Sequence, residues 1–99
     1  MENNVYFHVT SPNHSKAVIH IGKEKYTIKA NEDPLIVTVP VGRVVQVKIK
    51  AIKDFFNKVG SNKTYVKQIF VPNENAVVDV FISIGKAIVT IEMKERQCQ

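Results

Sequence analysis

Three histidines have the most suggestive spacing in this chain, since His8, His14 and His20 recur every six positions. If the chain forms a hairpin about His14, then His8 and His20 lie opposite each other on the outward face of two paired strands. Side chains so related have Cβ atoms about 4.5–5.5 Å apart, close enough for two imidazoles to share a metal ion. Zinc normally takes three or four protein ligands, and no cysteine or carboxylate is obviously placed nearby. We therefore expect a solvated histidine pair and neither a metal ion nor another cofactor.

Catalytic groups are not evident in the sequence. The serines lie in no nucleophile elbow, and spacing ties none of them to a histidine and an acid. The acidic residues are scattered, mostly in turns, and form no carboxylate pair for general acid–base chemistry. The four glycines form no phosphate-binding loop. We therefore expect a protein that is not an enzyme, and no small-molecule substrate is indicated.

Asp79 is the one unusual acid, because the stretch 77–81 is otherwise apolar. One interpretation is a buried carboxylate with a shifted pKa in a functional site. A second is the outward position of an alternating strand, and a third is a charge that protects an edge strand from aggregation. The two exposed interpretations are the more common, and we expect one of them.

Positive charge is concentrated in the middle of the chain. The whole chain has a net charge of +5, and residues 43–67 hold seven basic residues against the single acid Asp54. Such a segment indicates an anion-binding surface for nucleic acid, lipid headgroups or an acidic protein. It is equally typical of a solvated face that keeps strand edges from aggregating. The candidate residues are Arg43, Lys48, Lys50, Lys53, Lys58, Lys63 and Lys67.

Two observations favour the solubilising role. Twelve of the fourteen basic residues are lysine, whereas specific recognition of phosphates and bases relies on arginine. No paired aromatic strands of the RNA-recognition type are present. Three aromatic residues near the basic segment, Phe55, Phe56 and Tyr65, could still stack on bases. The adjacent Phe55 and Phe56 could instead anchor a partner, or one of them could plug the open end of the fold.

Alternating apolar and polar residues, with Val and Ile recurring throughout, predict that strands position these groups. We predict an all-β fold, a small antiparallel β-sandwich of seven or eight strands with one short irregular or helical excursion at 52–63. In that excursion Asp54 could cap a helical turn that Gly60 ends. A two-residue turn at Gly85-Lys86 is expected to join the last two strands. The expected strands cover 5–9, 17–21, 26–28, 35–39, 45–51, 65–71, 77–84 and 87–93.

Length and composition predict a single domain over residues 1–99. The lone Cys98 cannot form an internal disulfide, so packing must hold the fold. No signal peptide is visible, and no apolar run is long enough to span a bilayer. These features lead us to expect a cytoplasmic protein.

The order of features resembles that of PEGA-type domains over about residues 4–84. The matching positions are Val5, Phe7, Val9 and Ser11-Pro12, then Ala17, Ile19 and Ile21, then Asp33-Pro34 and the turn Pro40-Val41-Gly42-Arg43. Gly22 to Lys25 replace the family's usual Asp-Gly turn, and Phe55 and Phe56 stand nearest to its Gly-aromatic pair. The resemblance implies a small β-sandwich used for attachment or interaction, with no catalytic residues.

Together these features predict a non-enzymatic interaction or structural module that docks on a protein partner or self-associates through a strand edge. Sheets in a sandwich leave edges open, and adding a strand to such an edge is a common way to bind. The alternative is a basic binder of nucleic acid or another polyanion through residues 43–67. A small-molecule hydrolase ranks third.

Overall fold

The computed structural model describes residues 1–12, 14–55, 58–59 and 63–97, and these residues form strands and their connections with no helix. Alternation of inward and outward side chains, with β-branched residues at many inward positions, accounts for the extended conformation. The strands are β1 (Glu2–Thr10), β2 (Lys16–Ile21), β3 (Glu24–Lys29), β4 (Leu35–Pro40), β5 (Val44–Ile52), β6 (Asp54–Phe55), β7 (Lys58–Val59), β8 (Lys63–Phe70), β9 (Ala76–Ile84) and β10 (Val89–Gln97).

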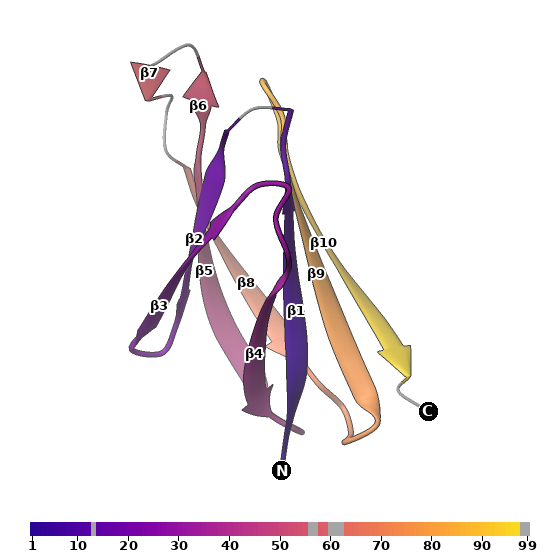
Figure 1. Cartoon of the computed structure of the whole chain (residues 1–99). Coiled ribbons are helices and arrows are strands. Elements are labelled where there is room, and N and C mark those ends of the chain that lie inside the picture. Colours follow the sequence, from indigo (N-terminus) through magenta and orange to yellow (C-terminus); the bar gives the residue numbers. More distant parts are fainter. Residues whose placement is uncertain (13, 56–57, 60–62, 98–99) are drawn as a thin grey trace.

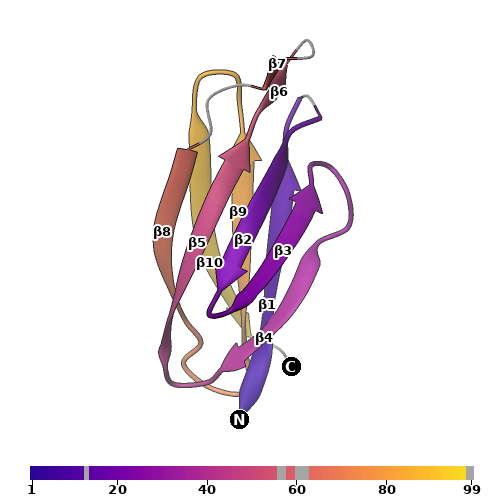
Figure 2. The same cartoon turned by 90° about the vertical axis from the view of Figure 1, so that its left-hand side faces the viewer.

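Eight of these strands form two four-stranded sheets that face each other (Figure 1). Sheet A has the order β10-β9-β1-β4, and sheet B has the order β3-β2-β5-β8. Figure 2 looks onto sheet B, with sheet A behind it. The predicted all-β sandwich is therefore confirmed.

One strand pair departs from the predicted antiparallel arrangement, because β1 and β9 run parallel, with Val5 opposite Val78 and Val9 opposite Ile82. The chain leaves β1 for sheet B, returns once as β4, and reaches the other side of β1 only after β5 and β8. A tight turn imposes antiparallel pairing on the strands that it joins, whereas a long crossover allows parallel pairing. Local alternation carries no information about such a distant pair.

The core lies between the two sheets and is almost entirely aliphatic. Phe7 is the largest side chain in it, and β1 also contributes Val5 and Val9. Sheet B contributes Ile19, Ile49 and other inward residues that are almost fully buried. Because these residues occupy every second position, the residues between them must point outward.

An asparagine ties the two sheets together at one end of the sandwich. Asn31 has φ of 65°, a left-handed conformation that asparagine tolerates better than most residues. Its backbone amide donates to the carbonyl of Val9 at 2.8 Å, and its side-chain amide donates to the carbonyl of Ser11 at 2.6 Å. The side-chain oxygen of Asn31 accepts from the amide of Ser11 at 3.2 Å. The connection from β3 to β4 is therefore fastened to the end of β1.

The excursion at 52–63 contains a short hairpin where the structure describes it. Asp54 pairs with Val59 and Phe55 with Lys58, so the predicted helical turn at Asp54 is wrong. Such pairing places the backbone in the extended conformation, which a helical turn excludes. Residues 56–57 and 60–62, which include the predicted Phe56 and the helix-ending Gly60, lie outside the described residues.

The predicted two-residue turn at Gly85-Lys86 is also wrong. The ladder between β9 and β10 ends at Ile84 opposite Val89, and the amide of Gly85 donates to the carbonyl of Ile88 at 2.9 Å. A type II′ turn needs positive φ at its first central residue, and the glycines with positive φ are Gly22 and Gly42. The connection therefore spans residues 85–88.

The described residues contain no helix long and apolar enough to cross a membrane.

Candidate functional site

The outer face of sheet B gathers positive charge from three neighbouring strands. In β5 the side chains of Val47, Ile49 and Ala51 are buried, so Lys48 and Lys50 point away from the core. The same alternation turns outward Lys16 and His20 of β2 and Lys25 and Lys29 of β3. We call the resulting set the basic face: Lys16, Lys25, Lys29, Lys48, Lys50 and His20.

Strand register places Lys16 directly opposite another lysine and brings His20 next to two lysines. His20 lies opposite Lys25 on one side and Lys48 on the other, and Lys16 lies opposite Lys29. Opposed side chains on one face have Cβ atoms about 4.5–5.5 Å apart, and like charges in this relation destabilise a sheet. No carboxylate occupies an outward position in the described strands of sheet B, and no salt bridge to a described carboxylate involves these lysines. The arrangement therefore opposes stability.

Two cavities lie at the ends of the basic face and extend its positive lining. One, of about 550 Å³, is lined by His20 and Lys48 together with Arg43 from the connection between β4 and β5. The other, of about 410 Å³, is lined by Lys16 and Lys29, with Lys53 beyond the end of β5. Its remaining lining residues are His14, Ser15, Ala30, Glu32 and Ile52. An anion on the face would therefore meet further cations at both ends.

The structure separates the basic residues that the sequence had grouped together. Lys63, Tyr65 and Lys67 share the other side of sheet B, because they pair with the inward residues of β5. The ammonium of Lys63 lies 5.7 Å from the centre of the Tyr65 ring. The ammonium of Lys53 donates to the carbonyl of Lys86 at 3.3 Å. Among the described side chains of the predicted set, Lys48 and Lys50 therefore lie on the basic face, and Arg43 and Lys53 line the cavities at its ends.

Other predicted residues fall where the structure describes no side chain. Phe56 lies outside the described residues, and for Phe55 and Lys58 only the backbone is described. Sequence reasoning missed Lys16, Lys25 and Lys29 because they belong to residues 1–42, where acids balance the bases. The available signal was the alternation carried one residue beyond the predicted strands 17–21 and 26–28, since these three lysines flank the ends of those strands.

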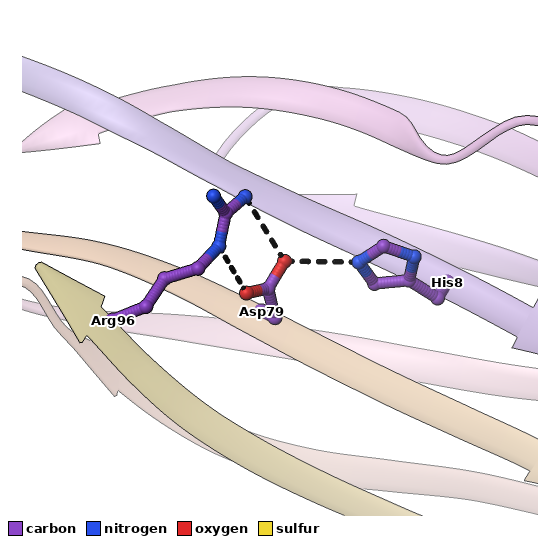
Figure 3. A network of polar contacts seen from close by, with 3 residues as sticks. All are labelled: His8, Asp79 and Arg96. Carbon is purple, nitrogen blue, oxygen red and sulfur yellow. Dashed lines mark hydrogen bonds and ion pairs between the residues drawn. The ribbon is translucent and has the colours of Figure 1, made fainter. Parts of the chain in front are cut away.

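The outer face of sheet A holds a different cluster, centred on Asp79 (Figure 3). Arg96 donates from Nε to Oδ2 of Asp79 at 2.6 Å and from Nη2 to Oδ1 at 3.5 Å. His8 Nε2 lies 3.0 Å from Oδ1 of the same carboxylate. Asp79 is only 7% exposed, whereas the side chain of Arg96 is 55% exposed. One acid thus joins the strands β1, β9 and β10.

Two opposing effects set the pKa of Asp79. Burial raises the pKa of the carboxyl group, but the hydrogen bonds from Arg96 and then from His8 outweigh it and hold the pKa below its ordinary value. The same hydrogen bond raises the pKa of the Arg96 guanidinium. The carboxylate is therefore held in its charged form. The edge-strand interpretation of Asp79 is wrong, because β9 lies between β1 and β10. Asp79 does take the outward position of an alternating strand, but its carboxylate is covered and not exposed as expected.

Aromatic rings lie beside the two side chains that contact Asp79. The His8 ring lies between Phe81, at 4.6 Å between ring centres, and Tyr6, at 6.5 Å. The guanidinium of Arg96 lies 4.9 Å from the centre of the Tyr6 ring, and Lys94 lies 5.7 Å from that of Phe81. We call these six residues the sheet A clamp: Tyr6, His8, Asp79, Phe81, Lys94 and Arg96. Its charged groups contact each other or a ring, which is an arrangement suited to holding strands together.

The predicted pairing of His8 with His20 is wrong. His8 belongs to β1 of sheet A, and His20 belongs to β2 of sheet B, with both side chains on outer faces. After β1 the chain crosses to the other sheet instead of folding back in a hairpin, so the core separates the two histidines. Within the described residues, no three or more His, Cys, Asp or Glu side chains are grouped as a metal site would require.

A scan of protein-family models, a search of curated proteins and a search of solved structures each found no match to this chain. The resemblance to PEGA-type domains therefore stays a prediction from the sequence.

Proposed function

We propose that this protein is a non-enzymatic binding module that docks on a polyanionic partner through its basic face. The observation that carries the proposal is the grouping of five lysines and His20 on one outer face where the described strands present no carboxylate. Segments that are distant in the sequence supply these cations, since Lys16 and Lys50 are on different strands. A charge excess of this kind attracts anions and concentrates them at the surface.

Lysine defines the chemistry that such a surface offers. An ammonium group is a compact point charge on a flexible stem, and it does not impose the planar two-point geometry of a guanidinium. Recognition would therefore depend on charge density more than on the shape of each anionic group. Binding would release counterions from the partner, so the affinity should fall steeply as salt is added.

Heparin–agarose chromatography of the full chain tests the proposal. We expect K48E/K50E to elute at a clearly lower salt concentration than the unchanged protein, because it reverses two adjacent charges on the face. The control K63E/K86E makes the same change in net charge away from the face, on the other side of sheet B and at the β9–β10 connection. Equal shifts for the two variants would show that only net charge matters and would contradict the proposal.

Docking or self-association through a strand edge is the second candidate. It is favoured by β8, which is an edge strand of eight residues with Val66 and Phe70 exposed. The edge strand β10, by contrast, carries three consecutive charged residues after Met93, as is typical of protected edges.

Light scattering after size exclusion tests self-association through this edge. A self-associating chain should show a mass that rises with concentration, and V66K should lower that mass by placing a charge beside the edge. A monomer at all concentrations would contradict self-association and leave the heparin result to decide the main proposal.

A further inference from the structure

An exposed apolar patch adjoins the basic face on the same side of sheet B. Val44, Val66 and Phe70 are 60%, 55% and 50% exposed. Val66 lies directly opposite Lys48, and Val44 lies opposite Phe70, so all three point to the side that carries the lysines. We call these three residues the apolar corner. Cations and exposed apolar groups are therefore presented together on one outer surface.

The arrangement of lysines and aromatic rings on this surface favours some classes of polyanion over others. The face is a sheet surface, and its cations are spread over three strands about 4.8 Å apart. Phe70 is the only phenyl or phenol ring at an outward position of the described strands of sheet B. Single-stranded nucleic acid is usually held by a positive groove with several aromatic rings on which bases stack. The basic face offers neither arrangement.

An anionic bilayer surface fits both parts of this layout. The lysines of the basic face project to the same side of one sheet, so an anionic surface lying against that side attracts each lysine that comes within one Debye length, about 8–10 Å. Long lysine side chains also keep their charge at the headgroups while their stems cover apolar surface. Exposed Val and Phe side chains can enter the boundary between headgroups and acyl chains, which adds an apolar contribution.

We infer that the polyanion bound by the basic face is the anionic headgroup layer of a lipid membrane, with the apolar corner inserted beside it. This inference rests on the proposed function, because it names the partner of the same face. It assigns a different role to each part. The lysines provide attraction that salt weakens, and the apolar corner provides attraction that salt does not weaken.

Co-sedimentation of the full chain with vesicles tests the inference. We expect binding to phosphatidylcholine vesicles that contain phosphatidylserine and little binding to phosphatidylcholine alone.

K48E/K50E should bind at least 25-fold more weakly, at about fivefold per lysine removed. V66T/F70S should bind roughly tenfold more weakly because less apolar surface is buried. The control I36T/I88T removes comparably exposed apolar groups from sheet A and the β9–β10 connection and should bind normally.

Parallel measurements with heparin and with a mixed-sequence oligonucleotide test the membrane inference separately from the proposed function. V66T/F70S should retain heparin binding, since it leaves every lysine in place. If heparin binds but vesicles with phosphatidylserine do not, the membrane inference fails and the proposed function stands. If the oligonucleotide binds more tightly than the vesicles and V66T/F70S has no effect, the partner is a nucleic acid and the inference is overturned. If none of the three binds, the proposed function fails as well.

Discussion

The two outer faces of the sandwich differ in how their charged side chains are paired. On sheet A, Asp79 is the partner of Arg96 and His8, and the rings of Tyr6 and Phe81 lie against these two side chains. On sheet B, Lys16 faces Lys29, and His20 lies between two lysines. On sheet A a carboxylate contacts a guanidinium of opposite charge, whereas on sheet B two ammonium groups of the same charge lie opposite each other.

This difference separates groups that stabilise the fold from groups that require another explanation. A covered carboxylate that is hydrogen-bonded to Arg96 and His8 favours the folded state, because its charge is satisfied only when β1, β9 and β10 come together. Directly opposed lysines work against folding by a few tenths of a kcal/mol or more. A small domain has little stability to spare, so an unfavourable arrangement of this kind points to binding.

The largest expected effect comes from removing the charge at the centre of the sheet A clamp. We expect D79N to lower the free energy of unfolding by about 2 kcal/mol, since a covered position loses charge-assisted hydrogen bonds. Loss of a fully buried ion pair costs about 3–5 kcal/mol, but Arg96 is more than half exposed, so the effect should be smaller. Urea denaturation measures the change. The control D33N neutralises an exposed acid and should change stability by less than about 0.5 kcal/mol.

Acidification should weaken the same contact in the unchanged protein. Because the pKa of Asp79 is lowered in the folded state, its contribution is fully present above the ordinary carboxyl pKa, near 4. The contribution is lost as the pH falls below that value and through the lower pKa of the folded state. The difference in unfolding free energy between the unchanged protein and D79N should therefore be constant at pH 5–7 and shrink below about pH 4. A difference that stays the same at lower pH would contradict the role of the Asp79 charge.

The sequence is sufficient to locate strands but not to join them into sheets. The alternation at Val45, Val47 and Ile49 predicts β5 and its two faces, since the period of two is a local property. The parallel pairing of β1 with β9 is a different matter, because more than sixty residues separate Val5 from Val78. No local pattern shows that β1 pairs with β9 instead of with the strand carrying His20, as the spacing of His8, His14 and His20 had suggested.

The candidate site was only partly predictable for the same reason. Lys48 and Lys50 both belong to the predicted basic set, and they share a face because they lie two positions apart on one strand. Lys16, Lys25 and Lys29 join them only through the register of β2 with β3 and β5. Asp79 was misjudged because its cover comes from Arg96 on a neighbouring strand, and strand order is a tertiary property.

The substitution K16E is expected to have the smallest effect on stability, but it tests the contrast between the two faces most directly. Stability should rise while binding to heparin falls. In K16E a carboxylate replaces one member of the opposed pair Lys16 and Lys29. A repulsive contact becomes an attractive one, so the free energy of unfolding should rise by about 0.5 kcal/mol. Elution from heparin–agarose should nevertheless move to lower salt, because the basic face loses a cation. Urea denaturation and chromatography of the same preparation measure both quantities.

K16Q separates the two causes of this gain, since it removes the repulsion without creating an attraction. It should fall between the unchanged protein and K16E in both measurements. A gain in stability with unchanged heparin binding would remove Lys16 from the binding surface. Loss of stability in both variants would mean that the lysines of sheet B support the fold as the sheet A clamp does, and the contrast between the two faces would then disappear.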